Sequence, residues 1–309
     1  MKNFSKRGAG ALAAIVLMLV STSARAMDKI PDEYKTNGFA AGCQAYSYSK
    51  GFTVFEAIRL TKEAGGKVIE LFPGQLISDD DKKPLNHTAT TETELDQVKA
   101  ELAKNHVLAV NYGVVTPGGR DATKRKAEWR KVFEFAKKMD LYGVTSEPAA
   151  EDMDEIEKLV KEFDIHFCIH DHPKQANNPN YKFWDPNYVL SLVKDRDPRM
   201  GSCADTGHWL SSGVDPIEPL KILKGRVMSS HLKDRNQKGM QHHDVAWGKG
   251  VGQVKEVLDE LKAQGFVGNI SIEYESDMDR DKETNAPKSY PAIKESFVFL
   301  QHYGQTAQR

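Results

Sequence analysis

The stretch SCADTGHW (residues 202–209) reads as a short apolar strand that ends in a carboxylate, Asp205, and an imidazole, His208, three residues later. Three other stretches have the same form, in which strand-forming residues stop at side chains able to bind a metal. These are FCIHDHP (167–173), MSSHLKD (228–234) and ISIEYE (270–275). If the ends of these strands meet at one rim of a sheet, their polar side chains form a site.

Strand-like and helix-like segments alternate eight times along the chain. The predicted strands cover 39–45, 67–72, 108–115, 143–147, 165–170, 200–205, 227–231 and 268–275. The predicted helices cover 54–64, 92–105, 122–139, 153–163, 185–194, 215–224, 251–264 and 292–303, with apolar residues three and four apart. Strict alternation indicates parallel strands joined by crossovers. Eight units in about 270 residues favour a single closed (β/α)₈ TIM barrel over an open sheet.

The first 26 residues have the pattern of a secretory signal peptide. A basic start precedes a short apolar run (9–20), and Ala24-Arg25-Ala26 is a small-x-small cleavage pattern. We therefore expect a signal peptide over 1–26, cleavage near Ala26, and a barrel domain over 27–309. The mature protein would then be secreted or periplasmic, with no stable membrane anchor.

Charge and cysteine content narrow the classes of partner. The whole chain has 43 basic and 44 acidic residues, and four of the basic residues lie in the signal segment. Cleavage would therefore leave 39 basic and 44 acidic residues, a net charge of −5. A mildly acidic chain is not expected to bind nucleic acid, because that affinity depends on clustered Lys and Arg. The odd number of cysteines excludes a complete disulfide framework, and Cys43, Cys168 and Cys203 each lie in an apolar run typical of a buried core.

Polar side chains gather where the predicted strands end. In a TIM barrel the catalytic groups lie at the carboxyl ends of the strands and in the loops that follow. The polar residues found there are Glu70, Asn111, Glu147, His170, His172, Asp205, His208, His231, Lys233, Glu273 and Glu275. Long loops at 73–91, 174–184 and 234–250 follow three of these strands, and loops on one rim usually shape a substrate pocket.

Four of these residues suit one divalent metal ion. His170, Asp205, His231 and Glu273 come one each from the fifth to the eighth predicted strand. Two imidazoles and two carboxylates are compatible with Mn²⁺, Zn²⁺, Co²⁺, Fe²⁺ or Mg²⁺, so the metal stays open. Because side chains two apart share a face of a strand, His172 competes with His170 as a ligand, and Glu275 with Glu273.

The remaining rim residues are candidates for catalysis and substrate binding. Besides Glu273, the candidate catalytic groups are Glu147, as a general base, and Lys233 and His208, which would contact a carbonyl or hydroxyl oxygen. Lys233 is equally compatible with a salt bridge at the rim. The candidate substrate-binding residues are Glu70, His172, His208, Trp209 and Glu275. Trp209, with Trp184 and Trp247, would either form an apolar wall for a sugar ring or pack in the interior.

These motifs together resemble the xylose isomerase-like barrel superfamily, specifically its exported sugar phosphate isomerase/epimerase branch. The resemblance spans nearly all of the chain after residue 26. It rests on HDHP (170–173), DTGHW (205–209), SHLKD (230–234), VAWGKG (245–250) and GNISIEYE (268–275). It implies a divalent metal held by an acid, an Asp, a His and a Glu. Asp205, His231 and Glu273 match the last three, and His208 matches a His that contacts substrate.

The resemblance also implies a reaction, in which the proton next to a carbonyl of a sugar is removed and an enediolate forms. Many epimerases use two carboxylates on opposite faces of the substrate, and this chain has His170 where one of them stands. Glu147 is the candidate for the second carboxylate. A small sugar or glycoside is the expected substrate, and a homo-oligomer is compatible with the sequence.

Three alternative functions stay open. The first is the cleavage of a keto-glycoside by elimination. The second is metal-dependent phosphodiester hydrolysis, as in endonuclease members of the superfamily that act at abasic sites, although the acidic charge speaks against it. The third is a carbohydrate-binding barrel without activity, against which the presence of Asp205, His231 and Glu273 argues.

Overall fold

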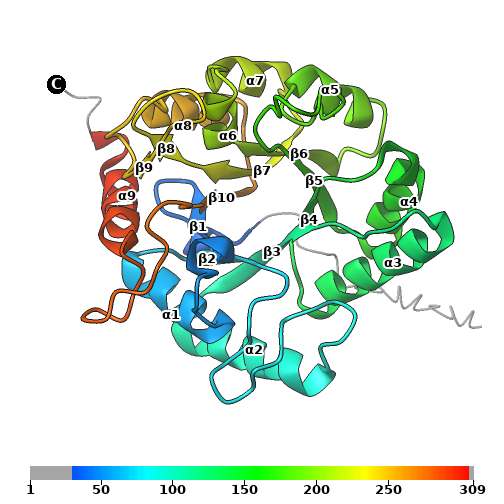
Figure 1. The fold of residues 1–309 in the computed structure, drawn as a ribbon, viewed down its shortest axis with the longest axis horizontal. Coiled ribbons are helices and arrows are strands. Elements are labelled where there is room, and N and C mark those ends of the chain that lie inside the picture. The colour runs from blue at the N-terminus through cyan, green and yellow to red at the C-terminus, as the bar shows by residue number, and fades with distance from the viewer. Residues whose placement is uncertain (1–29, 306–309) are drawn as a thin grey trace, which may run out of the picture.

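Eight parallel strands close into a barrel in the computed structural model, which describes residues 30–305 (Figure 1). The order of strands around the barrel is β1-β10-β7-β6-β5-β4-β3-β2. Helices surround the strands, so the predicted (β/α)₈ TIM barrel is confirmed. The predicted signal peptide and its cleavage site lie outside the described residues.

The barrel strands are β1 (Ala40–Gln44), β2 (Val68–Leu71), β3 (Leu108–Val115), β4 (Gly143–Ser146), β5 (His166–His170), β6 (Met200–Asp205), β7 (Val227–Leu232) and β10 (Asn269–Ile272). The outer helices are α1 (Val54–Ala64), α2 (Glu92–Asn105), α3 (Ala122–Lys138), α4 (Met153–Phe163), α5 (Pro186–Val193), α7 (Ile217–Ile222), α8 (Val254–Ala263) and α9 (Tyr290–His302). Five of these elements, α1, α2, α4, β3 and β6, have the predicted bounds.

Capping explains why α1 and α2 begin where the sequence predicts. Thr53 and Glu56 form a capping box at α1, and Thr91 and Glu94 form one at α2. Gly65, with a φ of 112°, ends α1 in the left-handed conformation that favours glycine. The apolar faces of the helices pack on the strands in one large core, which supports the rim without entering it.

The structure adds short elements that the sequence pattern did not reveal. Helix α6 (Thr206–Ser211) begins directly after β6, with the Asp205 carboxylate as its N-cap. Strands β8 (Asp234–Arg235) and β9 (Asp244–Val245) pair as an antiparallel hairpin inside the long loop after β7. Six-residue and two-residue elements are too short to show a period of their own. Within residues 30–305, no helix combines the length and the apolar character needed to cross a bilayer.

Candidate metal centre

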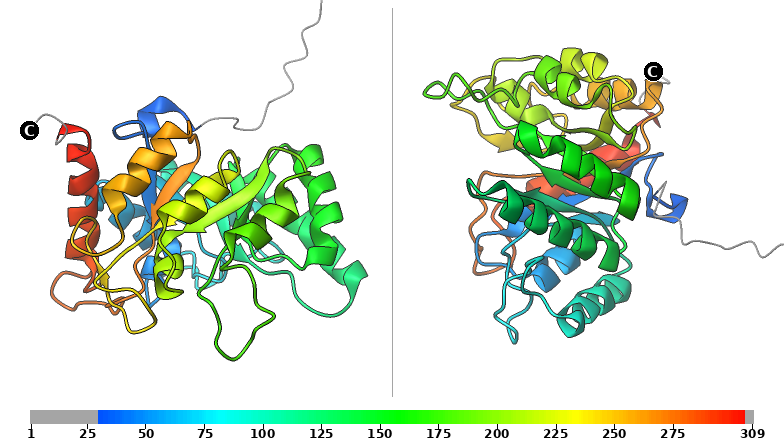
Figure 2. Two further views of the ribbon diagram at one scale, coloured as in Figure 1. Left: turned by 90° about the horizontal axis from the view of Figure 1, so that it is seen from above. Right: turned by 90° about the vertical axis from the view of Figure 1, so that its right-hand side faces the viewer.

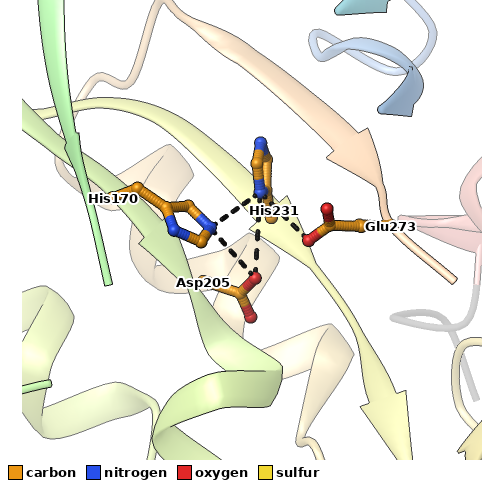
Figure 3. A group of neighbouring side chains, drawn as sticks. All are labelled: His170, Asp205, His231 and Glu273. Carbon is orange, nitrogen blue, oxygen red and sulfur yellow. Dashed lines mark hydrogen bonds and ion pairs between the residues drawn. The ribbon is translucent and has the colours of Figure 1, made fainter. Parts of the chain in front are cut away.

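Four neighbouring strands bring His170, Asp205, His231 and Glu273 to one point at the carboxyl end of the barrel. Their side chains point toward one another in Figure 3. His170 Nε2 lies 3.1 Å from His231 Nδ1 and 3.5 Å from Asp205 Oδ2. His231 Nδ1 lies 3.2 Å from Glu273 Oε2. One ligand atom from each residue falls within 4.8 Å of the others, and all four side chains are buried.

The chemistry of this cluster fits a divalent cation. Asp205 Oδ2 and Glu273 Oε2 are buried, and besides the imidazoles of the cluster their close partner is the Lys233 ammonium, at 2.9 and 2.7 Å. Two buried carboxylate oxygens beside two imidazole nitrogens are a donor set suited to a divalent cation that can accept their lone pairs. The arrangement gathers His170 and Glu273 with Asp205 and His231. His172 forms a second such group with Glu147 and His170, and Glu275 forms a third with His208 and Glu273.

Glu70 has a different place from the one predicted. The sequence predicts a substrate contact, but the Glu70 carboxylate is fully buried behind His231, with Oε2 3.0 Å from His231 Nε2. In the neutral imidazole, an Nε2–H that donates to this carboxylate leaves the lone pair on Nδ1, the atom that faces the other three ligands. A carboxylate behind a ligating imidazole fixes its tautomer and its orientation. Glu70 would therefore act on a metal bound here through His231.

Replacing Glu70 by leucine is expected to weaken metal binding by about 10- to 100-fold, because the imidazole of His231 loses the acceptor that orients it. Titration of the metal-stripped protein against a competing chelator measures the affinity. Glu70→Gln keeps an amide oxygen at the same place and is expected to lose less. The control is Glu63→Gln, since Glu63 forms an exposed ion pair with Arg59 on α1. Equal affinities in Glu70→Leu and the control would contradict this role.

Lys233 places a buried ammonium against the carboxylates of the cluster. Its Nζ lies 2.9 Å from Asp205 Oδ2, 2.7 Å from Glu273 Oε2 and 3.0 Å from Glu275 Oε2. Helix α6 leaves room for the lysine stem, because a Cβ on Gly207 would lie 2.6 Å from Lys233 Cβ. The ammonium therefore balances negative charge at the centre of the site.

Burial and the neighbouring charges together lower the pKa values of three of the four candidate ligands. Burial acts to raise the pKa of Glu273, but Lys233 and His231 outweigh it and hold that pKa below the usual range. Burial likewise opposes ionisation of Asp205, yet His208 and Lys233 keep its pKa well below normal. Burial lowers the pKa of His170, which favours the neutral imidazole that a metal requires.

His208 and Glu275, which the sequence analysis expects to contact a substrate, lie beside the cluster. His208 Nε2 lies 3.3 Å from Lys233 Nζ, and burial lowers the pKa of His208 well below its usual value. Glu275 accepts a hydrogen bond of 2.7 Å from Arg235, whose other carboxylate partner is Asp244 on β9. Arg235 was missed by the sequence analysis. Its position two residues after Lys233 was the available signal, because residues two apart share a face.

Glu147 belongs to a second polar group at the rim, together with His172 and Tyr181. His172 Nδ1 lies 2.5 Å from Glu147 Oε1, and the Tyr181 hydroxyl donates to the same oxygen. Burial would raise the pKa of Glu147, but the contact with His172 outweighs it and lowers that pKa. Tyr181 was not predicted, because a tyrosine in the long loop after β5 carries no periodic signal.

Trp209 does not form the apolar wall that was one of its two predicted roles. Its side chain is 1% exposed and packs in the main hydrophobic core, as does that of Trp247. Trp184 is the half-buried member of the three. Trp209 lies within α6, the short helix that the sequence pattern did not reveal.

Comparisons with known proteins agree with this architecture. A family model described as xylose isomerase-like TIM barrel matches residues 58–296. A solved structure of an uncharacterised protein from Parabacteroides distasonis ATCC 8503 is 30% identical, with a TM-score of 0.65 over 85% of this chain and 98% of the other. A sugar phosphate isomerase/epimerase from the same organism is 16% identical, with a TM-score of 0.61 over 89% and 99%.

A curated relative matches a shorter part of the chain. An uncharacterised protein of Methanocaldococcus jannaschii is 31% identical over 123 residues, which are 38% of this chain and 41% of that protein. The chain therefore spans less than half the length of this relative.

Proposed function

The chain belongs to the xylose isomerase-like TIM barrel family, and on that premise we propose that it is a metal-dependent enzyme of the sugar isomerase/epimerase type. The observation that carries the proposal is the convergence of His170, Asp205, His231 and Glu273 at the barrel mouth. A divalent ion held by these residues would supply Lewis-acid polarisation of a substrate oxygen. The neighbour described as a sugar phosphate isomerase/epimerase supports the reaction class.

Two carboxylates on opposite walls of the barrel support proton transfer at two faces of a substrate. Glu273 directly follows β10 and Glu147 directly follows β4, and these strands are four places apart in either direction around the barrel. We assign removal of the proton beside the carbonyl to one of these acids and its return to the other. This arrangement supplies a second carboxylate although His170 stands where many epimerases have Glu.

Lys233 and His208 are suited to stabilise negative charge that develops on a substrate oxygen. Lys233 would donate a hydrogen bond to a carbonyl oxygen as it becomes negative, in a site from which water is largely excluded. His208, held beside Lys233, would bind a hydroxyl of the same sugar. We also propose that the protein acts outside the cytoplasm, on the basis of the signal-peptide pattern in residues 1–26.

Exchange of hydrogen with solvent tests this function. The metal-loaded mature protein is incubated in D₂O with free, phosphorylated and 3-keto sugars and with 3-keto glycosides, and the mixtures are followed by NMR. We expect deuterium at a carbon next to a carbonyl for at least one substrate class. The same protein stripped of metal by a chelator is the control and is expected to show none. The products distinguish isomerisation and epimerisation from elimination of a glycosidic bond.

A negative result would also be informative. Full occupancy by metal, with neither exchange nor product over the whole panel, would contradict the proposal and favour a carbohydrate-binding barrel. Cleavage of DNA at abasic sites, with a rate that falls steeply as salt rises, would favour the phosphodiesterase alternative.

A further inference from the structure

A pocket lies in the loop between β5 and α5, next to the rim group of Glu147, His172 and Tyr181. This loop projects from the barrel in Figure 2, where it is drawn in green. The pocket has a volume of about 560 Å³, which falls within the range of small-molecule sites. Its lining includes Lys174, Gln175, Asn178, Tyr181, Trp184 and Tyr188.

Tyr181 joins this pocket to the reacting groups. Its ring lines the pocket, while its hydroxyl donates to Glu147 and accepts the backbone N–H of His172 at 3.0 Å. One side chain therefore borders both the pocket and the rim group that contains a proposed proton-transfer residue. A molecule that extends from the metal centre past Glu147 would reach the pocket at Tyr181.

The aromatic side chains of the loop are held in place before any ligand binds. Trp184 Nε1 donates to the Tyr181 carbonyl oxygen at 3.1 Å. The Phe183 ring contacts the rings of Tyr181 and Tyr188, with centroids 5.7 and 5.5 Å apart. The base of the loop is tied to α6, because the Lys174 N–H donates to Ser212 Oγ at 2.9 Å. Such preorganisation lowers the conformational entropy that binding would cost.

The lining combines flat apolar faces with hydrogen-bond donors. Trp184 and Tyr188 offer aromatic rings, and Lys174 Nζ lies 4.7 Å from the centroid of the Trp184 ring. Gln175 and Asn178 add amides that donate and accept. Because the Lys174 ammonium lies over one face of the Trp184 ring, a ligand ring with one apolar side and a rim of hydroxyl groups would stack on the opposite face.

We propose that this pocket binds the second sugar ring of a glycoside whose first ring occupies the metal centre. The inference rests on the proposed function for the identity of the reacting ring. It narrows the substrate class from sugars in general to glycosides with at least two rings. Trp184 is then the residue that distinguishes a disaccharide from a monosaccharide.

The test compares two probes on the metal-loaded protein. Calorimetry measures the affinity for 3-keto derivatives of disaccharides and for the corresponding 3-keto monosaccharide. We expect Trp184→Ala to weaken disaccharide binding about tenfold, the effect of losing one aromatic contact, and to leave monosaccharide binding unchanged. Trp184→Phe keeps an aromatic face and is expected to recover part of the loss. The control is Tyr303→Ala. Like Trp184, Tyr303 has a lysine ammonium over its ring, with Lys262 Nζ 5.6 Å from the centroid, but it does not line this pocket.

The outcomes separate this inference from the proposed function. Equal affinity of Trp184→Ala and wild type for disaccharides, or an equal loss for both probes, would overturn the second subsite. Dependence on Trp184 seen with aryl glycosides but not with disaccharides would overturn the assignment of a sugar ring. If exchange in D₂O fails but Trp184→Ala still weakens disaccharides selectively, the subsite stands and the proposed function does not.

Discussion

Replacement of Glu273 by glutamine is expected to lower kcat by about 10²- to 10⁴-fold, the range found when a positioned acid or base is removed. The reason is that this residue serves two purposes in the proposed site. Its Oε2 lies among the four candidate ligand atoms, 3.2 Å from His231 Nδ1, and its carboxylate is one of the two opposed acids. Glutamine keeps the shape but removes the negative charge that a cation and a proton both require. The rate of deuterium exchange is the measurement.

Glu275→Gln is the matched control, because Glu275 lies two residues away and forms its ion pairs with Lys233 and Arg235. Metal analysis after gel filtration is expected to show loss of metal from Glu273→Gln and retention by Glu275→Gln, with both variants folded by circular dichroism. The reverse pattern would make Glu275 the ligand. Full activity in Glu273→Gln would remove the basis for the assignment.

Replacement of Lys233 by methionine is expected to destabilise the metal-free protein by about 3–5 kcal/mol, the cost of leaving buried charges without their partner. The ammonium lies within 3.0 Å of Asp205, Glu273 and Glu275, and its own side chain is fully buried. The free energy of unfolding in urea, measured with a chelator present, tests this. Lys221→Met is the control, because Lys221 pairs with Glu218 on the exposed face of α7 and is expected to change stability by less than about 0.5 kcal/mol.

The free energy of unfolding of Lys233→Met should also depend on pH and on bound metal. The pKa values of Asp205 and Glu273 are held below normal, against burial, in part by Lys233. The stability that these two ionised carboxylates contribute is therefore present above about pH 4 and is lost as the pH falls through their folded-state pKa values. The free energies of unfolding of wild type and variant should consequently converge in acid. A divalent ion at 100 times its Kd adds about 2.7 kcal/mol and should therefore offset part of the loss of about 3–5 kcal/mol in the variant. Equal stability of the two lysine variants without metal would contradict the role of Lys233.

Much of the fold was predictable because its signals are local. Thr53 and Thr91 begin their helices through contacts with residues three positions away, and each strand is a short apolar run between breakers. The alternation of these segments leaves few topologies other than a barrel. Helix α6 and the β8–β9 hairpin were missed because their signals come from tertiary contacts. The carboxylate of Asp234, for instance, accepts N–H groups from Gly248, Gly250 and Gly252 and so shapes the hairpin loop.

The sequence by itself determined the barrel, its family and the four residues that the structure gathers as candidate ligands. It could do so because strand ends in a parallel barrel must share one rim, so position along a strand is enough to place a side chain there. Only the tertiary structure decided that Glu70 supports His231, that Trp209 is buried, and that Tyr181 joins Glu147 to a pocket. Glu70 and His231 are 161 residues apart, and their contact exists only because closure of the barrel brings β2 opposite the ligand-bearing strands. Which side chains meet across such a distance in the sequence depends on how the whole barrel packs. A local pattern of residues therefore cannot predict these contacts.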